Sequence, residues 1–170
     1  MEFNNLIKER YSCKKYNETK VDRDVLLKIL EAAKFAPTAK NSQEQKIYVI
    51  ESQEGLEKVD LLTPCRYGAK TVLMFAYDVN GEYTYTDSEL KSGVEDVTIV
   101  ATHVMLSAKN EGVETCWLNK FNPKLAKEIF DLPENENVVL LMDIGFPAPE
   151  GKPLINHTNR KDVKEYIIYK

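Results

Sequence analysis

DVTIVATHVMLSAKN, residues 96–110, carries the clearest structural signal in the chain, because its hydrophobic residues lie on more than one side of a helix. One face follows the helical spacing and consists of Val97, Val100, Ala101, Val104, Met105 and Ala108. Ile99 and Leu106 lie off that face. A helix that is apolar on more than one side is buried on more than one side. We therefore expect a central helix from about Asp96 to Asn110 that packs against a sheet and against a second subunit.

The segments on either side of this helix alternate between helix and strand patterns. Asp22 is a good N-cap for a second helix, Pro37 ends that helix, and Gly112 stops the central one. The expected elements are a short first helix with Phe3, Leu6 and Ile7 on one face, helices at 22–35, 55–62 and 123–130, strands at 46–50, 71–77, 114–118 and 138–144, a turn-rich connection at 78–87 and an amphiphilic terminal helix at 163–169. This alternation predicts an α/β or α+β fold, and the length fits one domain spanning residues 1–170.

The composition excludes several classes of protein. A hydrophobic content of 43% and a charged content of 29% are ordinary for a soluble globular chain. The net charge is −4 and no basic cluster is large enough for nucleic acid, so we expect no nucleic-acid partner. The first residues lack the pattern of a secretory signal, and no apolar run is long enough to span a bilayer. We expect a cytoplasmic protein without a membrane partner.

The cysteine and histidine content argues against a metal centre. The three cysteines, Cys13, Cys65 and Cys116, are an odd number at long spacings, which does not fit a disulfide framework or a zinc site. His103 and His157 are the only histidines. We interpret Cys116, which has apolar neighbours and no histidine close in sequence, as a buried structural thiol. His103, on the edge of a buried helix, is interpreted as a core residue.

The sequence RYSCKKY, residues 10–16, places two cations around a hydroxyl on extended backbone. A guanidinium can bind two oxygens of a phosphate monoester, the hydroxyl of Ser12 can donate one bond, and Lys14 adds a point charge. By itself this pattern is more typical of a solvated surface turn. It becomes informative only together with other segments.

Three further segments contain residues that suit a cofactor. The loop APTAKNSQ, residues 36–43, ends in two amides, which match the alternating donors and acceptors on the edge of a flavin ring, although a plain helix-to-strand connection has a similar composition. The segment GVETCWLN, residues 112–119, follows the central helix, and its Trp117 fits either the core or a pocket wall. The fourth, TNRK at 158–161, is a basic turn before the C-terminal segment.

In order and approximate spacing these segments resemble the FMN-dependent nitroreductase family. The family motif Arg-x-Ser-x-Arg/Lys-x-aromatic corresponds to residues 10–16, and Ala-Pro-Ser-x-x-Asn-x-Gln corresponds to residues 36–43, with Thr38 in place of the serine. A central helix that starts with aspartate and continues into Gly-x-x-x-Cys-Trp corresponds to residues 96–117. Gly145-Phe146-Pro147 and then Arg160 complete the resemblance, which covers essentially the whole chain.

The resemblance implies a three-layer α+β sandwich, with a mixed, mostly antiparallel sheet flanked by helices and a C-terminal arm exchanged in an intertwined homodimer. It also implies FMN at the dimer interface, with NADH or NADPH as the reductant of a ping-pong hydride transfer that needs no catalytic side chain. The acceptor would be a nitroaromatic, a quinone or a similar electron-poor small molecule. The implied cofactor-binding residues are Arg10, Tyr11, Ser12, Lys14 and Arg160 around the phosphate, Pro37, Thr38, Ala39, Asn41 and Gln43 from the partner at the ring, and Trp117, Leu118 and Asn119 near the reactive edge.

Departures from the family pattern leave alternatives open. Many relatives have Pro-Trp where this chain has Glu44-Gln45, some have a basic residue where it has Thr158, and the connection at 80–88 is short. We therefore expect an open site with a broad range of acceptors. The same fold could also perform enone reduction, dehalogenation or flavin fragmentation, or serve as a non-catalytic flavin-binding module. A plain interaction domain without a cofactor is a further alternative.

Overall fold

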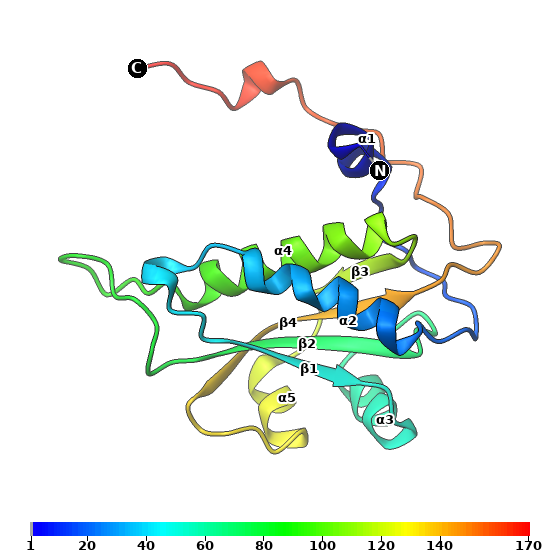
Figure 1. Cartoon of the computed structure of the whole chain (residues 1–170), viewed down its shortest axis with the longest axis horizontal. Helices are drawn as coiled ribbons and strands as arrows, with labels where there is room; N and C mark the ends of the chain where they lie inside the picture. Colours follow the sequence, from blue (N-terminus) through cyan, green and yellow to red (C-terminus); the bar gives the residue numbers. More distant parts are fainter. Residues whose placement is uncertain (1) are drawn as a thin grey trace.

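A four-stranded sheet lies between two layers of helices in the computed structural model, which describes residues 2–170 (Figure 1). The strands are β1 (Gln45–Ile50), β2 (Thr71–Asp78), β3 (Glu114–Leu118) and β4 (Glu136–Gly145), in the spatial order β1-β2-β4-β3. All three ladders are antiparallel, and an isolated bridge between Ser12 and Thr115 runs parallel. The expected α+β sandwich with a mostly antiparallel sheet is confirmed.

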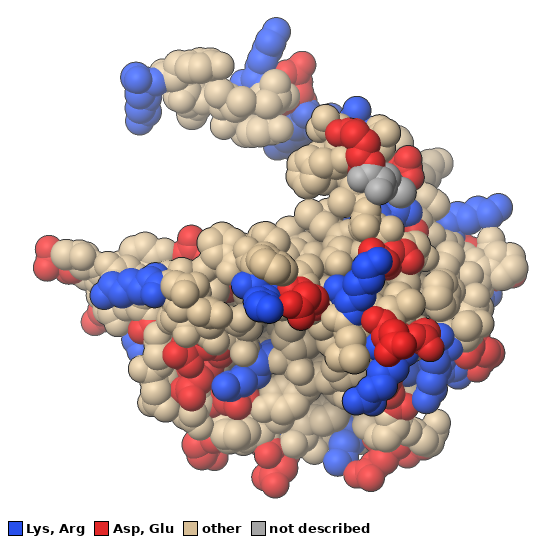
Figure 2. Space-filling model, viewed as in Figure 1, with Lys and Arg blue, Asp and Glu red and all other residues tan. Residues whose placement is uncertain are grey.

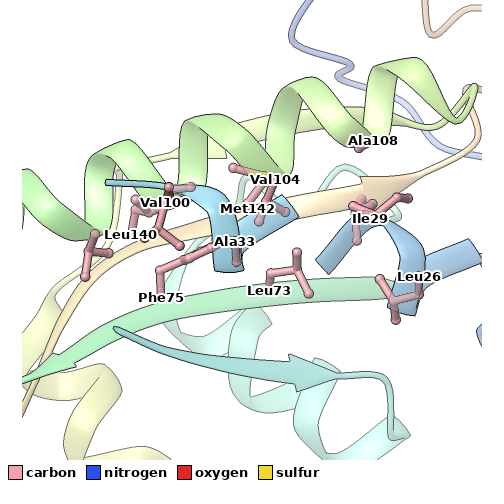
Figure 3. Packing of buried hydrophobic residues seen from close by; sticks show 14 of the residues in the cluster. Leu26, Ile29, Ala33, Leu73, Phe75, Val100, Val104, Ala108, Leu140 and Met142 are labelled. Atoms are coloured by element: carbon pink, nitrogen blue, oxygen red, sulfur yellow. The ribbon is translucent and has the colours of Figure 1, made fainter. Parts of the chain in front are cut away.

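The first helical layer consists of α4 (Gly93–Asn110) and α2 (Arg23–Glu31), which continues as the 3-10 helix η1 (Ala32–Phe35). Side chains from this layer meet those of the two central strands in one core, shown in Figure 3. The labelled residues come from α2 and η1 (Leu26, Ile29, Ala33), β2 (Leu73, Phe75), α4 (Val100, Val104, Ala108) and β4 (Leu140, Met142). The apolar face predicted for the central helix therefore packs on the sheet.

The central helix begins at Gly93, three residues before the expected start at Asp96. Asp96 is not the cap: it lies within the first turn, and its carboxylate accepts hydrogen bonds from the Ala39 amide and the Ser92 hydroxyl. Gly93 packs directly under the Tyr77 ring, where a Cβ would lie 2.2 Å from a ring carbon. This close approach leaves no room for a side chain and therefore requires glycine. Because glycine has a low helix propensity, the sequence pattern did not indicate the first turn of the helix.

The second layer covers the opposite face of the sheet with α3 (Gln53–Leu62) and α5 (Pro123–Ile129). Their buried residues, including Val59 and Ala126, pack against alternate residues of β2 and β4 such as Met74 and Leu141. Ser52 caps α3, and Asn122 caps α5 directly before a proline, so local capping fixes both starts. No helix of the described residues is long and apolar enough to cross a membrane.

Both ends of the chain lie outside this sandwich. Helix α1 (Phe3–Glu9) buries only Leu6, while Phe3 and Ile7 of the expected apolar face are exposed. The residues after Gly151, here called the C-terminal arm, pass α1 and project from the body, and Figure 2 shows open space between the arm and the body. The arm exposes seven large hydrophobic residues, namely Leu154, Ile155, Val163, Tyr166, Ile167, Ile168 and Tyr169.

The terminal helix expected at 163–169 is wrong. Only a short 3-10 turn, η3 (Val163–Glu165), forms there. Short helices depend on packing of their apolar face for stability, and the apolar residues at 163–169 remain exposed among residues 2–170. The amphiphilic pattern of this segment is therefore left without a packed face among the described residues.

The connection from β2 to α4, residues 79–92, projects at one end of the sandwich (Figure 1). A bridge between Thr84 and Lys91 folds it back on itself. Glu44 lies against its turn, since a Cβ on Gly81 would come within 2.0 Å of the Glu44 carboxylate. This short excursion carries no helix, which agrees with the turn-rich connection expected from the sequence.

Candidate functional site

A cavity of about 450 Å³ opens where four separate parts of the chain meet. It lies among the segment after α1, the turn before β2, the end of β3 with the loop that follows, and the C-terminal arm. Its lining residues are Arg10, Tyr11, Ser12, Lys14, Cys65, Tyr67, Cys116, Trp117, Leu118, Asn119, Lys120, Leu154, Asn156, His157 and Arg160. This volume is within the usual range for small-molecule sites.

The segment at residues 10–16 is extended because it is hydrogen-bonded on both sides. The Cys13 amide donates to the Thr115 carbonyl at 3.0 Å, and the Tyr16 amide donates to the Tyr67 carbonyl at 3.1 Å. The Tyr11 hydroxyl donates to the Gly151 carbonyl at 2.7 Å, which ties the start of the arm to the same segment. These bonds fix the backbone from which Arg10, Ser12 and Lys14 reach the cavity.

Arg10 and Arg160 form a cationic pair at the arm side of the cavity. Burial lowers the pKa of Arg10, and the positive charge of Arg160 lowers it further. Arg160 donates one bond to the Asn159 carbonyl at 2.8 Å, which leaves the rest of its guanidinium free for a ligand. The Glu114 carboxylate, which raises the pKa of Arg10, is already paired with Lys109 at 2.6 Å. Two guanidiniums that repel each other suit a phosphate, which each can bind through two oxygens.

Lys14 and Lys120 lie on another side of the cavity, around Cys65 and Tyr67. The Lys14 amine is 5.9 Å from the centre of the Tyr67 ring. A hydrogen bond with Tyr67 lowers the pKa of the Cys65 thiol, and Lys120 and Lys14 lower it further by their charge. The same bond raises the pKa of Tyr67 to about 12, so the tyrosine stays protonated. Both amines therefore lie near one thiol.

Cys116 and Trp117 form the wall between these two sides. Burial raises the pKa of Cys116 to about 12, which fits the structural thiol expected from the sequence. Trp117 is partly buried, and its indole N–H donates to the Asn119 side chain at 3.0 Å. The backbone of residues 117–119 is thereby held along the edge of the cavity.

The loop at residues 36–43 does not line this cavity. It lies by the other end of α4, where the Ala39 amide donates to Asp96 at 2.8 Å. Lys40, Asn41 and Gln43 have left-handed backbone angles with φ between 53° and 56°. Such angles cost energy for residues other than glycine and persist when neighbouring contacts impose them. Of the predicted site residues, Pro37, Thr38, Ala39, Asn41 and Gln43 are the ones that the fold keeps apart from the rest.

Apart from Cys116, which the sequence analysis interpreted as a structural thiol, six lining residues were not predicted from the sequence. They are Cys65, Tyr67, Lys120, Leu154, Asn156 and His157. None belongs to a recognisable motif, and each reaches the cavity only through the tertiary fold. His103, in contrast, stays outside the cavity and contacts the Ile99 carbonyl of its own helix at 2.9 Å, as expected of a structural histidine.

Comparisons with known proteins agree on one family. The model of the Nitroreductase family matches residues 7–65 and 59–146. A crystal structure of a nitroreductase family protein from Clostridium difficile 630 is 30% identical and superposes with a TM-score of 0.93 over 100% of this chain and 99% of that one. A protein of Methanothermobacter thermautotrophicus, provisionally named NADH dehydrogenase/NAD(P)H nitroreductase, is 27% identical over 84% of this chain and 75% of its own length.

A further solved structure contains a cofactor. It is a provisionally named nitroreductase from Exiguobacterium sibiricum in complex with FMN, 20% identical, with a TM-score of 0.86 over 100% of this chain and 98% of that one. At this identity the likeness shows the shared fold alone.

Proposed function

Since the chain belongs to the nitroreductase family of oxidoreductases, we propose that it is an FMN-dependent NAD(P)H oxidoreductase. Its acceptors would be nitroaromatics, quinones or similar electron-poor molecules. When bound, FMN supplies the redox chemistry, accepting a hydride from NAD(P)H and passing it to the acceptor. Structures and names of relatives support both the flavin and the nicotinamide reductant.

The observation that carries this proposal is the pair of guanidiniums at the arm side of the cavity. Arg10 and Arg160 face a common space, and no aspartate or glutamate lines it. Ser12 adds a hydroxyl donor beside them, and its backbone is fixed by the bridge to Thr115. A dianionic phosphate ester would neutralise both arginines, so the residues present fit the phosphate end of FMN.

The remaining residues of the cavity would bind and orient the ring. Lys14, which the resemblance placed at the phosphate, lies on the side of Tyr67, where it would instead face the negative charge that the ring gains on reduction. The backbone of residues 117–119 would position the reactive edge. The pKa values of Tyr67 and Cys116 are raised to about 12, so neither group exchanges a proton at neutral pH, and the chain would contribute mainly positioning and electrostatics.

We propose that the active unit is a homodimer in which each site uses residues of both chains. The loop at 36–43 carries the amides suited to a flavin ring but lies outside the cavity of its own chain. The arm exposes large hydrophobic side chains, and open space separates much of the arm from the body (Figure 2). A second copy that accepts the arm would bury these side chains and could bring its own loop to the ring.

The cavity would remain open to a broad range of acceptors, because the excursion at residues 79–92 is short and contains no helix to cover the ring. A structure of the FMN complex with a closed lid over the ring would contradict this part of the proposal.

The test is an absorbance spectrum of the purified protein, followed by anaerobic mixing with NADH and, separately, with NADPH. We expect a bound yellow flavin that bleaches promptly with at least one nicotinamide, and recovery of the colour when a nitroaromatic or quinone is added. A bound flavin that neither nicotinamide bleaches would indicate a flavin-binding module without turnover. A colourless protein that refuses added FMN would refute the proposal.

A further inference from the structure

The lining of the cavity has an excess of positive charge that runs against the charge of the whole protein. The chain as a whole has a net charge of −4. The cavity, however, is lined by Arg10, Lys14, Lys120 and Arg160, and by no aspartate or glutamate. Such a concentration of one sign of charge at a concave site attracts ligands of the opposite sign.

Three of these four cations have an assigned role in the proposed function. Arg10 and Arg160 match the two negative charges of a phosphate monoester, and Lys14 lies beside Tyr67, where the ring would be. Lys120 is the one of the four for which the proposed cofactor offers no assigned negative charge. None of the acidic side chains in residues 2–170 forms an ion pair with it.

Lys120 is placed by the loop that leaves β3, two residues after the strand ends at Leu118. Lys120 lines the same cavity as Lys14 and Tyr67, and the charges of Lys120 and Lys14 both lower the pKa of the Cys65 thiol. Arg10 interacts instead with Arg160 and with Glu114. Lys120 is therefore positioned where a ligand that approaches the ring would pass, away from the phosphate side.

We propose that Lys120 binds the negatively charged group of an anionic acceptor, such as a carboxylate attached to a nitroaromatic or to another conjugated system. The inference rests on the proposed function and goes beyond it by naming the charge class of the substrate. An exposed amine on a four-carbon stem with several rotatable bonds can reach carboxylates at several positions on a small acceptor, which is compatible with a broad acceptor range.

The diphosphate of NAD(P)H is a second anion that could reach the same amine. Measuring the two half-reactions independently distinguishes an anionic acceptor from the NAD(P)H diphosphate as the anion that Lys120 binds. For the acceptor half-reaction, the bound flavin is reduced by light, without nicotinamide, and then mixed with acceptor. For the other half-reaction, the oxidised protein is mixed with NADH or NADPH.

The acceptors are three nitrobenzenes that differ in the charge of the para substituent: 4-nitrobenzoate, 4-nitrobenzyl alcohol and a 4-nitrobenzyl trimethylammonium salt. In the parent protein we expect reoxidation to be fastest with the benzoate. In Lys120→Gln, the ratio of the second-order rate constants for the benzoate and the alcohol should fall by about fivefold, the size expected for one exposed ion pair. Lys120→Glu should invert the preference toward the cation.

Lys124→Gln is the matched control, because Lys124 is an exposed lysine four residues further along that lies outside the cavity. In Lys124→Gln, the ratio of the rate constants for the benzoate and the alcohol should equal that of the parent. Binding can also be measured without turnover. The oxidised protein is titrated with benzoate and, separately, with benzamide, and the change in flavin absorbance reports how much ligand is bound. Lys120→Gln should weaken the binding of benzoate by about fivefold more than that of benzamide.

Equal benzoate-to-alcohol ratios in the parent and in Lys120→Gln would overturn the inference while leaving the proposed function intact. So would a slower reaction with NADH or NADPH in Lys120→Gln without any change in acceptor selectivity, because the anion at Lys120 would then be the nicotinamide nucleotide. A protein whose reduced flavin none of the three acceptors reoxidises would contradict the proposed function itself.

Discussion

Asp143 on β4 is completely buried, and neither of its carboxylate oxygens has a hydrogen-bond partner among the described residues. Burial raises its pKa to about 9, although Arg66 counteracts part of this rise. The Arg66 guanidinium is engaged by Asp60 at 2.6 Å, so it does not neutralise Asp143. A carboxyl in this environment carries a proton at neutral pH, since an ionised form would lack both water and a partner.

This state makes the stability of the protein depend on pH in a defined direction. Between the ordinary pKa of 3.8 and about 9, the unfolded chain loses the Asp143 proton while the folded chain keeps it. The free energy of unfolding therefore falls as pH rises through this window, by up to about 1.4 kcal/mol per pH unit. Asp143→Asn should lack this contribution. In urea titrations, the free energy of unfolding of the variant relative to that of the parent should therefore increase with pH. A difference that is independent of pH would contradict a protonated Asp143.

Arg10 provides the residue-level test of the phosphate site. Arg10→Ala should raise the dissociation constant for FMN by at least about tenfold, because removal of one partner leaves the phosphate charge incompletely paired. Fluorescence titration of the apoprotein with FMN measures this directly. Arg23→Ala, which removes an exposed arginine at the start of α2, should bind FMN as the parent does. Equal affinity in the Arg10 and Arg23 variants would show that Arg10 is wrongly assigned.

At the scale of elements, Asp96 connects three parts of the chain. One carboxylate oxygen accepts from the Ala39 amide at 2.8 Å, and the other accepts from the Ser92 hydroxyl at 2.7 Å. Ser92 in turn accepts from the Tyr83 amide at 3.1 Å. The Lys40 amine also lies 4.6 Å from the centre of the Tyr83 ring. Helix α4, the loop at 36–43 and the excursion at 79–92 are thus held together at one carboxylate.

Loss of this carboxylate should loosen the loop. Asp96→Leu strands the Ala39 amide and the Ser92 hydroxyl, and should lower the free energy of unfolding by about 1–3 kcal/mol. Asp96→Asn keeps one acceptor oxygen and should lose less. Asp24→Leu serves as the control, since Asp24 is an exposed aspartate in the first turn of α2. If Asp96→Leu and Asp24→Leu unfold at the same urea concentration, the connection through Asp96 contributes nothing to stability.

The elements that local patterns specify were predicted within a few residues. Strand β3 was predicted from Glu114 to Leu118 and is found there, and Gly112 stops α4 with a left-handed φ of 77°. The start of α4 was missed because Gly93 follows from a contact with Tyr77 across the fold. The prediction of a terminal helix was wrong because its hydrophobic residues pack against no other part of residues 2–170. Tertiary contacts, which no local pattern contains, account for both differences.

At the scale of the whole molecule, the proposed dimer depends on the exposed hydrophobic residues of the arm. Ile155 is fully exposed and Ile168 is 78% exposed. We predict that the double variant Ile155→Asp/Ile168→Asp dissociates into monomers and loses FMN, because burying an unpaired carboxylate at an interface is costly. Light scattering coupled to size exclusion measures the mass. Leu61→Asp is the control, since Leu61 is 74% exposed on α3 in the opposite layer. A dimer that survives the double substitution would contradict the role of the arm.

The candidate site could be predicted only in part. Arg10, Ser12 and Lys14 belong to one motif, and the fold brings them into a cavity with Arg160, far away in sequence. Lys120 could not be found, because a lone lysine after a strand has no distinguishing pattern. The loop at 36–43 was predicted to act on the partner's site, and this remains a prediction. Sequence motifs report residues that share a backbone segment, whereas a cavity wall is assembled by the whole fold.

The measurement that tests the shared site most directly is the FMN content of a mixed dimer. One chain carries Arg10→Ala and the other carries Thr38→Glu/Asn41→Glu, which places two carboxylates where the ring would lie. If each site combines the cavity of one chain with the loop of the other, one site of the mixed dimer is intact and the other carries both defects. We predict one tightly bound FMN per two chains, and almost none in either variant alone. A mixed dimer without FMN would contradict the account, because each cavity would then depend on the loop of its own chain.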